Sequence, residues 1–359
     1  MIVFWFLIAY TLPGVLTQGD AVFYYDASSL GLGGNTTVLE NGLNPAGMCL
    51  ADAISLKLGW VFFECREKRG LRVYDNYGNN IGIATIAVNQ ITILDLAPFS
   101  IMIPLKNLRF GVKYYKLYDF GYSFHHEYRD NFYQLVKIVD DSYAGGVKAL
   151  SPGLGLSYKS LNIAVAQDLI YGSAKREMRI YYPHGEDSLK KEEWFFSTTT
   201  SQYGLILNIS YHFRLGYFFE KNFSASVQDT TLLYPAGHNL GIYFQPPYRV
   251  PTKFVAELNY KLWRKRILSY KFGVEHSLLS DYAVRYGFCL LPDYNQPAIW
   301  TTSLTLGVGG NFKNYHFDFG FMLSKRDYAN TDFGGLGIAE RQFFDETQNH
   351  FVFSFGFKL

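Results

Sequence analysis

The segment HHEYRD, residues 125–130, holds the densest group of side chains that could bind a metal ion or exchange protons. Histidine and carboxylate groups are common zinc ligands, but a zinc site needs three or four ligands at suitable spacing. No further ligand is spaced to complete such a site, so the segment is predicted to be a polar loop or rim. We therefore expect neither a metal site nor a cofactor.

The chain lacks the motifs of common catalytic sites. It contains no GxSxG elbow, HExxH or P-loop, and its GLGG and GVGG runs lack dinucleotide-binding spacing. A dispersed set of charges could build a hydrolytic site, or the charges could pair across an interior, where burial without a partner is costly. We expect pairing, and hence no enzyme activity. The set comprises Arg109, Lys113, Glu257, Lys261, Lys271, Glu275, Arg285 and Asp318.

Composition favours β-structure and argues against a nucleic-acid partner. Aromatic residues make up 18% of the 359 residues, and such residues are enriched in strands. The formal net charge of +2 provides no basic surface to neutralise phosphates. The cysteines Cys49, Cys65 and Cys289 are odd in number and lack CxxC spacing, so neither a disulfide framework nor a zinc site is indicated.

Residues 1–21 form an uncharged apolar run followed by small residues, a pattern typical of a secretory signal peptide. The alternative is a membrane anchor. However, the run breaks at Pro13 and is shorter than the roughly 20 apolar residues that a spanning helix needs. We expect cleavage between Thr17 and Ala21.

About a dozen segments alternate between apolar residues and polar or tiny ones. In residues 54–62 every second residue is large and apolar, from Ile54 to Phe62, and residues 203–213 and 315–324 repeat the pattern. This period predicts strands with one apolar face. Each segment is long enough to cross a membrane as a tilted strand of roughly 9–11 residues.

The two faces of these strands distinguish a membrane barrel from a soluble sandwich. The polar face contains Gly, Ser, Asn and few charges, whereas a water-facing sheet is usually rich in Lys, Glu and Thr. The apolar face is unusually aromatic, as in the girdles of membrane barrels. We predict an all-β fold, a transmembrane antiparallel β-barrel of about 14 strands formed by residues 52–359.

The connections are predicted to differ in length between the two ends of the barrel. Tight turns at 106–107, 159–160 and 263–266 suit the periplasmic side. The longer polar segments 182–193 and 325–348 are predicted to be extracellular loops.

Glycines recur on the face predicted to point inward. Because glycine weakens a strand, this repetition indicates local bending or the close approach of another backbone. Two accounts stay open: barrel curvature prefers small inward residues, or an internal plug packs against them. The inward positions include Gly59, Gly111, Gly204, Gly273, Gly287 and Gly320.

The chain ends in HFVFSFGFKL, which places Phe351, Phe353, Phe355, Phe357 and Leu359 on one face. Such an end resembles the terminal strand that the barrel-assembly machinery recognises in bacterial outer-membrane barrels. It departs from that pattern in having Ser354 where glycine is common, and Leu359 in place of a terminal aromatic residue.

The stretch SSLGLGGNTTVLENGLNPAGMCLADAISLKLGWVFFE, residues 28–64, resembles the N-terminal region of FadL-type outer-membrane transporters. In that family a Gly-rich segment leads through a short helix into an NPAG-type motif followed by the first strand. The motif here is Asn44, Pro45, Ala46 and Gly47. Residues 235–262 and 301–328 are similar in style to the PorV-like branch.

The resemblance implies a 14-stranded barrel whose N-terminal segment, here residues 22–51, folds back as a hatch inside the lumen. In that family, hydrophobic substrates such as long-chain fatty acids or aromatic hydrocarbons bind between hatch and wall. They leave through a lateral gap created by a kinked strand. In the motif, Asn44 can cap or turn, Pro45 fixes the backbone, and Ala46 and Gly47 allow close packing.

Two functions follow as expectations. The first is uptake of hydrophobic small molecules across the outer membrane of a Gram-negative-type bacterium. The second is a noncatalytic accessory role in type IX protein secretion, as in PorV-like members, with secretion-system proteins as partners. In both cases we expect contact with outer-membrane lipid and with the barrel-assembly machinery, and no contact with nucleic acid.

Overall fold

The computed structural model describes residues 20–130, 132–227, 230–262, 266–278, 281–292, 298–331 and 341–359. The signal peptide predicted for residues 1–21 lies almost wholly outside this part of the chain, as does most of the turn predicted at 263–266. Within the described residues, no helix has the length and apolar character needed to span a membrane.

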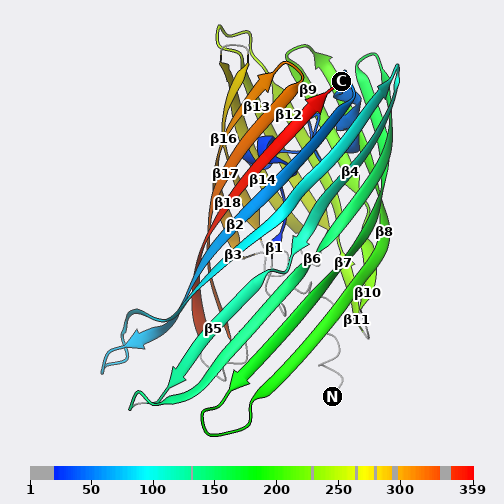
Figure 1. Ribbon diagram of the computed structural model, residues 1–359. Helices are drawn as coiled ribbons and strands as arrows, with labels where there is room; N and C mark the ends of the chain where they lie inside the picture. Colours follow the sequence, from blue (N-terminus) through cyan, green and yellow to red (C-terminus); the bar gives the residue numbers. More distant parts are fainter. Residues whose placement is uncertain are drawn as a thin grey trace.

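The wall is a closed antiparallel barrel of 14 strands, as predicted. The ring closes because the last strand pairs with the first wall strand, and β4 pairs with β6 (Figure 1). The wall strands are β2 (Ser55–Tyr74), β3 (Asn80–Leu105), β4 (Leu108–Asp119), β6 (Leu135–Tyr158), β7 (Leu161–Tyr181), β8 (Ser188–Ser210), β9 (Phe213–Glu220), β12 (Ala236–Phe244), β13 (Thr252–Leu262), β14 (Arg266–Leu278), β15 (Tyr282–Pro292), β16 (Trp300–Phe312), β17 (Tyr315–Thr331) and β18 (Arg341–Lys358).

Six shorter elements complete the described structure. Three belong to the N-terminal part of the chain, and β5 continues the line of β4 along β6. The hairpin β10–β11 forms a separate small sheet. Their bounds are β1 (Asp20–Ala21), α3 (Ala27–Gly31), η1 (Pro45–Leu50), β5 (Tyr122–Arg129), β10 (Phe223–Val227) and β11 (Thr230–Tyr234).

The alternating residues form an apolar band around the outside of the barrel. On β2 and the residue before it, the alternate side chains from Ile54 to Phe62 are 38% to 43% exposed, whereas Lys57 between them is 5% exposed. Phe62 pairs with Phe351 of β18, and the next outward pair, Glu64 with Asn349, is polar on both strands. The apolar residues therefore end at one common level on neighbouring strands, as a lipid boundary requires.

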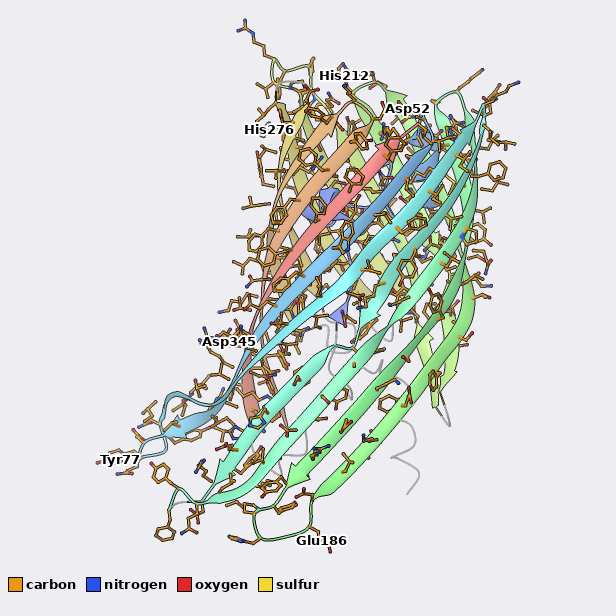
Figure 2. The ribbon with its side chains drawn as sticks, in the orientation of Figure 1. Asp52, Tyr77, Glu186, His212, His276 and Asp345 are labelled. Carbon is orange, nitrogen blue, oxygen red and sulfur yellow. The ribbon has the colours of Figure 1, made fainter. Side chains whose placement is uncertain are left out.

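The two ends of the barrel differ as the sequence predicts, but the long connections are shorter loops than expected. Tight turns at Lys106 and Lys159, both with positive φ, lie near the same end as Asp52 and His212. At the other end long hairpins project, and Figure 2 shows Tyr77 and Glu186 at two of their tips.

The loop predictions for 182–193 and 325–348 were wrong in extent. β8 already begins at Ser188, while β17 continues to Thr331 and β18 begins at Arg341. Polar composition marks where a strand leaves lipid, but backbone pairing between two neighbouring strands continues into water. Strand ends therefore lie well beyond the ends of the apolar band.

The N-terminal segment folds back into the lumen, as the predicted hatch does (Figure 1). Ala27 and Leu30 of α3, Val38, and Ala46 of η1 are fully buried. We use "hatch" below for residues 22–51. The boundary of the hatch at residue 51 and the signal boundary at residue 21 remain predictions.

Candidate functional site

The NPAG motif lies at the start of η1 inside the barrel. Asn44 caps this helix, because its side-chain oxygen accepts a hydrogen bond from the Ala46 N–H at 2.9 Å. Its amide nitrogen donates to the Thr37 carbonyl at 2.7 Å. All four motif residues, from Asn44 to Gly47, are buried. The motif therefore ties two turns of the hatch together.

Several predicted inward glycines face the hatch backbone at close range. A Cβ added to Gly320 would lie 2.6 Å from the Ala27 carbonyl oxygen, and one added to Gly273 would lie 2.5 Å from the Leu32 carbonyl oxygen. At Gly204 an added Cβ would lie 2.7 Å from the Ala46 nitrogen. Even a methyl group would overlap the hatch at these positions.

The remaining inward glycines differ in their surroundings. A Cβ at Gly287 would lie 2.6 Å from the Gly33 nitrogen, whereas at Gly111 the nearest hatch atom, on Met48, is at 3.5 Å. Gly59 is buried and pairs with Ser354 of β18. Close approach by the hatch therefore accounts for some of these positions but not for all.

The fit between hatch and wall predicts a position-specific effect of adding a side chain. Gly204→Val should lower the free energy of unfolding by about 1–3 kcal/mol, because the new side chain overlaps the NPAG motif. Gly356→Val is the matched control, since its Cβ would meet no atom closer than 3.5 Å. Chemical denaturation in detergent measures both, and equal effects would contradict the expected fit.

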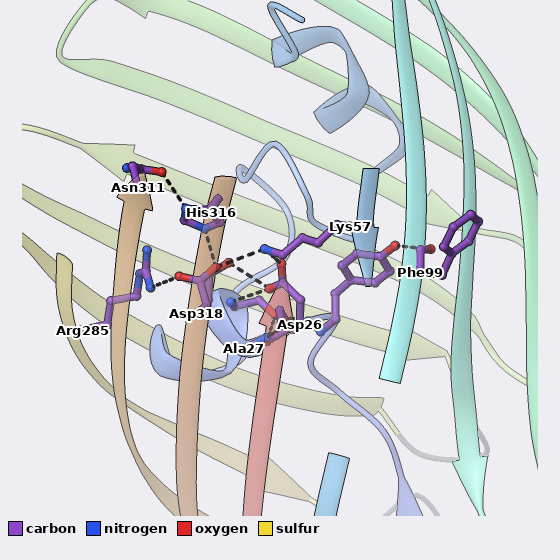
Figure 3. Close-up of polar contacts among 12 residues, drawn as sticks. Asp26, Ala27, Lys57, Phe99, Arg285, Asn311, His316 and Asp318 are labelled. Carbon is purple, nitrogen blue, oxygen red and sulfur yellow. Dashed lines mark hydrogen bonds and ion pairs between the residues drawn. The ribbon is translucent and has the colours of Figure 1, made fainter. Parts of the chain in front are cut away.

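A buried ion network holds the first helix of the hatch against the wall (Figure 3). Asp26 caps α3 by accepting a hydrogen bond from the Ser29 N–H at 2.8 Å. Lys57 of β2 bonds Asp26 and lies 3.2 Å from the Asp318 carboxylate. Asp318 also receives a hydrogen bond from Arg285 at 2.6 Å. The carboxylates and the lysine are each no more than 5% exposed.

A second carboxylate of the wall binds the hatch backbone directly. Glu257 accepts hydrogen bonds from the N–H groups of Thr36 and Thr37 at 2.6 and 2.7 Å. Lys271 neutralises it at 2.9 Å. The hatch is thus fastened at both α3 and the turn that precedes the NPAG motif.

The expected pairing of the inward charges holds for most members of the set. Beyond the pairs just described, Glu275 binds Arg285 at 2.7 Å, and Lys261 lies 3.6 Å from Glu220. Lys113 instead donates to the Asn44 carbonyl at 3.3 Å, and Arg109 donates to the Leu108 carbonyl at 3.1 Å. Lys113 thus bonds a backbone carbonyl of the hatch, and Arg109 bonds a backbone carbonyl beside a turn, instead of a carboxylate.

The HHEYRD segment forms most of β5 and its end, on a hairpin with β6. Its His125 contacts Asp140 at 2.5 Å, and both side chains are more than half exposed. Among the described residues, no group of three His, Cys, Asp or Glu side chains is placed to hold a metal ion. The segment lies on a projecting hairpin rather than in an irregular loop.

The C-terminal aromatic residues lie on the outside of β18, where Phe353 and Phe355 are 41% and 38% exposed. Their strand pairs with β2 from Ser55 to Gly70 and so closes the ring. The role of this strand in assembly remains a prediction.

The wall opens sideways between β3 and β4. These strands pair only where Phe99 to Leu105 oppose Tyr114 to Leu108. Beyond Tyr114 the edge of β4 instead takes up the start of the described chain, with Ala21 opposite Tyr118. From Pro98 outward, β3 pairs only with β2 among the described strands. We call this separation the lateral gap.

A break in the third wall strand accompanies the lateral gap. β4 ends at Asp119, and β5 resumes the same line at Tyr122 after Phe120 and Gly121. On the neighbouring strand Gly145 has φ 108°, which only glycine adopts readily. The line of β4 and β5 is therefore broken in the region where β4 no longer pairs with β3.

A cavity of about 160 Å³ lies beside the lateral gap, between the first residues of the hatch and the wall. Phe23 and Tyr25 form its hatch side, and Tyr25 donates a hydrogen bond to the Phe99 carbonyl, where the β3–β4 seam ends, at 3.0 Å. Wall residues on the other side include Phe63, Ile91 and Leu96. The cavity is of the size that holds a benzene-sized ligand.

Three charged residues beside the lateral gap were not predicted from the sequence. Lys116 of β4 bonds Asp95 of β3 across the gap and lies 2.7 Å from Asp119. Lys116 has the same strand parity as the outward residues Phe110 and Tyr114, so alternation places it in lipid. The only available signals were Pro98, which cannot donate to a ladder, and the DFG sequence at 119–121 between two strand segments.

No family model and no curated protein matches the chain. Several solved structures match the fold of the chain. A FadL homologue from Pseudomonas aeruginosa aligns with a TM-score of 0.70 at 11% identity, covering 95% of this chain and 99% of that one. The toluene transporter TodX of P. putida aligns at 0.63 and 14% identity, covering 94% and 99%. The monoaromatic hydrocarbon channel CymD aligns at 0.56 and 12% identity, covering 94% and 98%.

These alignments extend over nearly the whole length of each chain. At such low identity the agreement concerns architecture. The chain therefore has the FadL-type barrel fold.

Proposed function

We propose that this protein is an outer-membrane channel for the uptake of small hydrophobic compounds. The compound enters from the end with the long hairpins, occupies the cavity beside the hatch, and leaves sideways through the lateral gap into the membrane. The hatch lies inside the lumen (Figure 1) and its backbone closely approaches inward glycines of several wall strands, which favours a sideways exit over a straight path. The chain acts as a passive conduit and carries out no reaction.

The single observation that carries the proposal is the position of the cavity at the lateral gap. Aromatic and aliphatic side chains line the cavity on both the hatch side and the wall side, together with a smaller number of polar and charged groups, as is usual for sites that bind apolar small molecules. Outside the gap, Leu94 and Leu96 of β3 are 75% and 67% exposed, within the apolar band. An apolar compound would therefore move from the aromatic and aliphatic part of the cavity lining to lipid without entering water.

The apolar outer band supports placement in the outer membrane, where closed barrels satisfy every backbone hydrogen bond internally. The secretion-accessory role considered above has no comparable support. Two of the similar structures are a toluene transporter and a monoaromatic hydrocarbon channel, and no feature of the described chain favours cargo docking. We therefore propose uptake alone.

Filling the cavity tests the proposal. Cells that produce the protein should take up radiolabelled toluene faster than cells without it, and Val61→Trp should reduce that gain about tenfold. Val61 lines the cavity, so the larger ring would occupy the space of the ligand. Val308→Trp is the matched control, because Val308 faces outward and is 50% exposed.

Both variants should form folded barrels in equal amounts, which resistance to protease verifies. Uptake no faster than in cells that lack the protein would contradict the proposal. Equal uptake by the two variants would show that the cavity is not on the path.

A further inference from the structure

The charged side chains that line the cavity have an uneven balance. They are two cations, Lys116 and Arg326, and four carboxylates. The carboxylates are Glu67, Asp95, Asp119 and Glu346. Behind this lining, Arg69 binds Glu67 at 2.6 Å. Within the lining the carboxylates therefore outnumber the cations, while Arg69 and Lys148, which lies opposite Lys116 on β6, add positive charge around it.

Lys116, Arg326 and Arg69 each already have a carboxylate partner. Arg326 bonds Glu346 through two nitrogens, at 2.5 and 3.0 Å. Arg69 bonds Glu67 and is 1% exposed. Lys116 is shared by two carboxylates at the lateral gap, Asp95 and Asp119.

This arrangement discriminates between ligands by charge. The side chains of Lys116, Asp95 and Asp119 are only 16%, 28% and 26% exposed, so charges there interact more strongly than in water. An entering carboxylate would lose its hydration and find these three cations occupied, which is unfavourable. An uncharged apolar compound incurs no such cost.

Resting on the proposed function, we infer that the cavity admits uncharged apolar compounds and rejects carboxylates. We further infer that Asp95 and Asp119 determine this selectivity by occupying Lys116. Removing both negative charges leaves Lys116 as a cation without a counter-charge at the gap. A free, partly buried ammonium group is a natural partner for a carboxylate.

Toluene and benzoate form a matched pair of probes, because the same ring carries an uncharged methyl group in toluene and a carboxylate in benzoate. Cells that produce the protein should take up toluene at least about tenfold faster than benzoate, each measured relative to cells without the protein. Comparable gains for the two compounds, or a larger gain for benzoate, would overturn the inference. If cells with the protein take up neither compound faster than cells without it, the proposed function is overturned instead.

The double variant Asp95→Asn/Asp119→Asn tests the assigned residues. It should raise the ratio of benzoate to toluene uptake at least about tenfold. Adding Lys116→Met to this variant should abolish the increase, because no cation then remains for the carboxylate. An unchanged ratio in a folded double variant would overturn the role of the two aspartates.

The chain contains a matched control cluster on the outward face of β17 and β18, the two strands whose residues Arg326 and Glu346 line the cavity. Lys325 lies between Asp327 and Asp345, at 3.6 and 3.9 Å, with all three side chains 46% to 64% exposed. Asp327→Asn/Asp345→Asn makes the same change in charge around a lysine without altering the lining. Its ratio of benzoate to toluene uptake should equal that of the unsubstituted protein. An increase as large as that of Asp95→Asn/Asp119→Asn would show that overall charge, and not the two aspartates at the gap, determines the ratio.

Discussion

Lys57→Met is expected to lower the free energy of unfolding by about 3 kcal/mol. Lys57 joins the Asp26 carboxylate of the hatch to Asp318 of the wall, and all three groups are almost fully buried. Methionine keeps the length of the side chain but leaves the Asp26 carboxylate without its cation in a place that water does not reach. Asp318 keeps Arg285 as a partner at 2.6 Å, which limits the loss.

The measurement is chemical denaturation in detergent, with Lys325→Met as the control. Lys325 also has two acidic neighbours, but it is largely exposed, so its loss should cost less than about 0.5 kcal/mol. Because the ion network includes the Asp26 cap of α3, Lys57→Met should also increase protease cleavage within the hatch more than cleavage within the barrel wall. Similar small losses for both variants would contradict a structural role for the buried network.

The barrel was predictable from the sequence because its cause is local. The alternation from Ile54 to Phe62 places large apolar side chains on one face, and that face lies outside in the structure. The closing strand was equally readable, since Phe351 to Leu359 repeat the same period. A strand with one lipid-facing side has only one register that keeps its polar residues inside.

Contacts between distant segments could not be predicted in this way. The NPAG motif indicates a turn, but its packing against Gly204, about 160 residues later, depends on how the ring closes. The bonds from Glu257 to Thr36 and Thr37 likewise depend on the position of the hatch. The sequence showed which residues point inward but not which of them meet.

The family resemblance implied a lateral gap, but the position of the gap escaped prediction because it is a failure of pairing between two regular strands. Lys116 has the strand parity of a lipid-facing residue, and Asp95 has that of a residue facing the lumen. They meet only because β3 and β4 separate beyond Tyr114. Such a pair is invisible to a rule that treats each strand alone.

Bridging the lateral gap should block uptake. In the variant Asp95→Cys/Lys116→Cys, a short bifunctional methanethiosulfonate can link the two strands, since the native side chains already bond each other. The link should reduce toluene uptake at least about tenfold, because it spans the lateral gap through which the ligand passes. Each single variant, treated with the same reagent, controls for reaction at the native cysteines.

Reversing the cross-link tests sideways exit through the gap in a single sample, because the same cells can be measured before and after reduction. Toluene uptake should be lost when the link forms and should return when dithiothreitol removes it. Undiminished toluene uptake by a fully cross-linked barrel would rule out sideways exit, since the compound would then leave by another path.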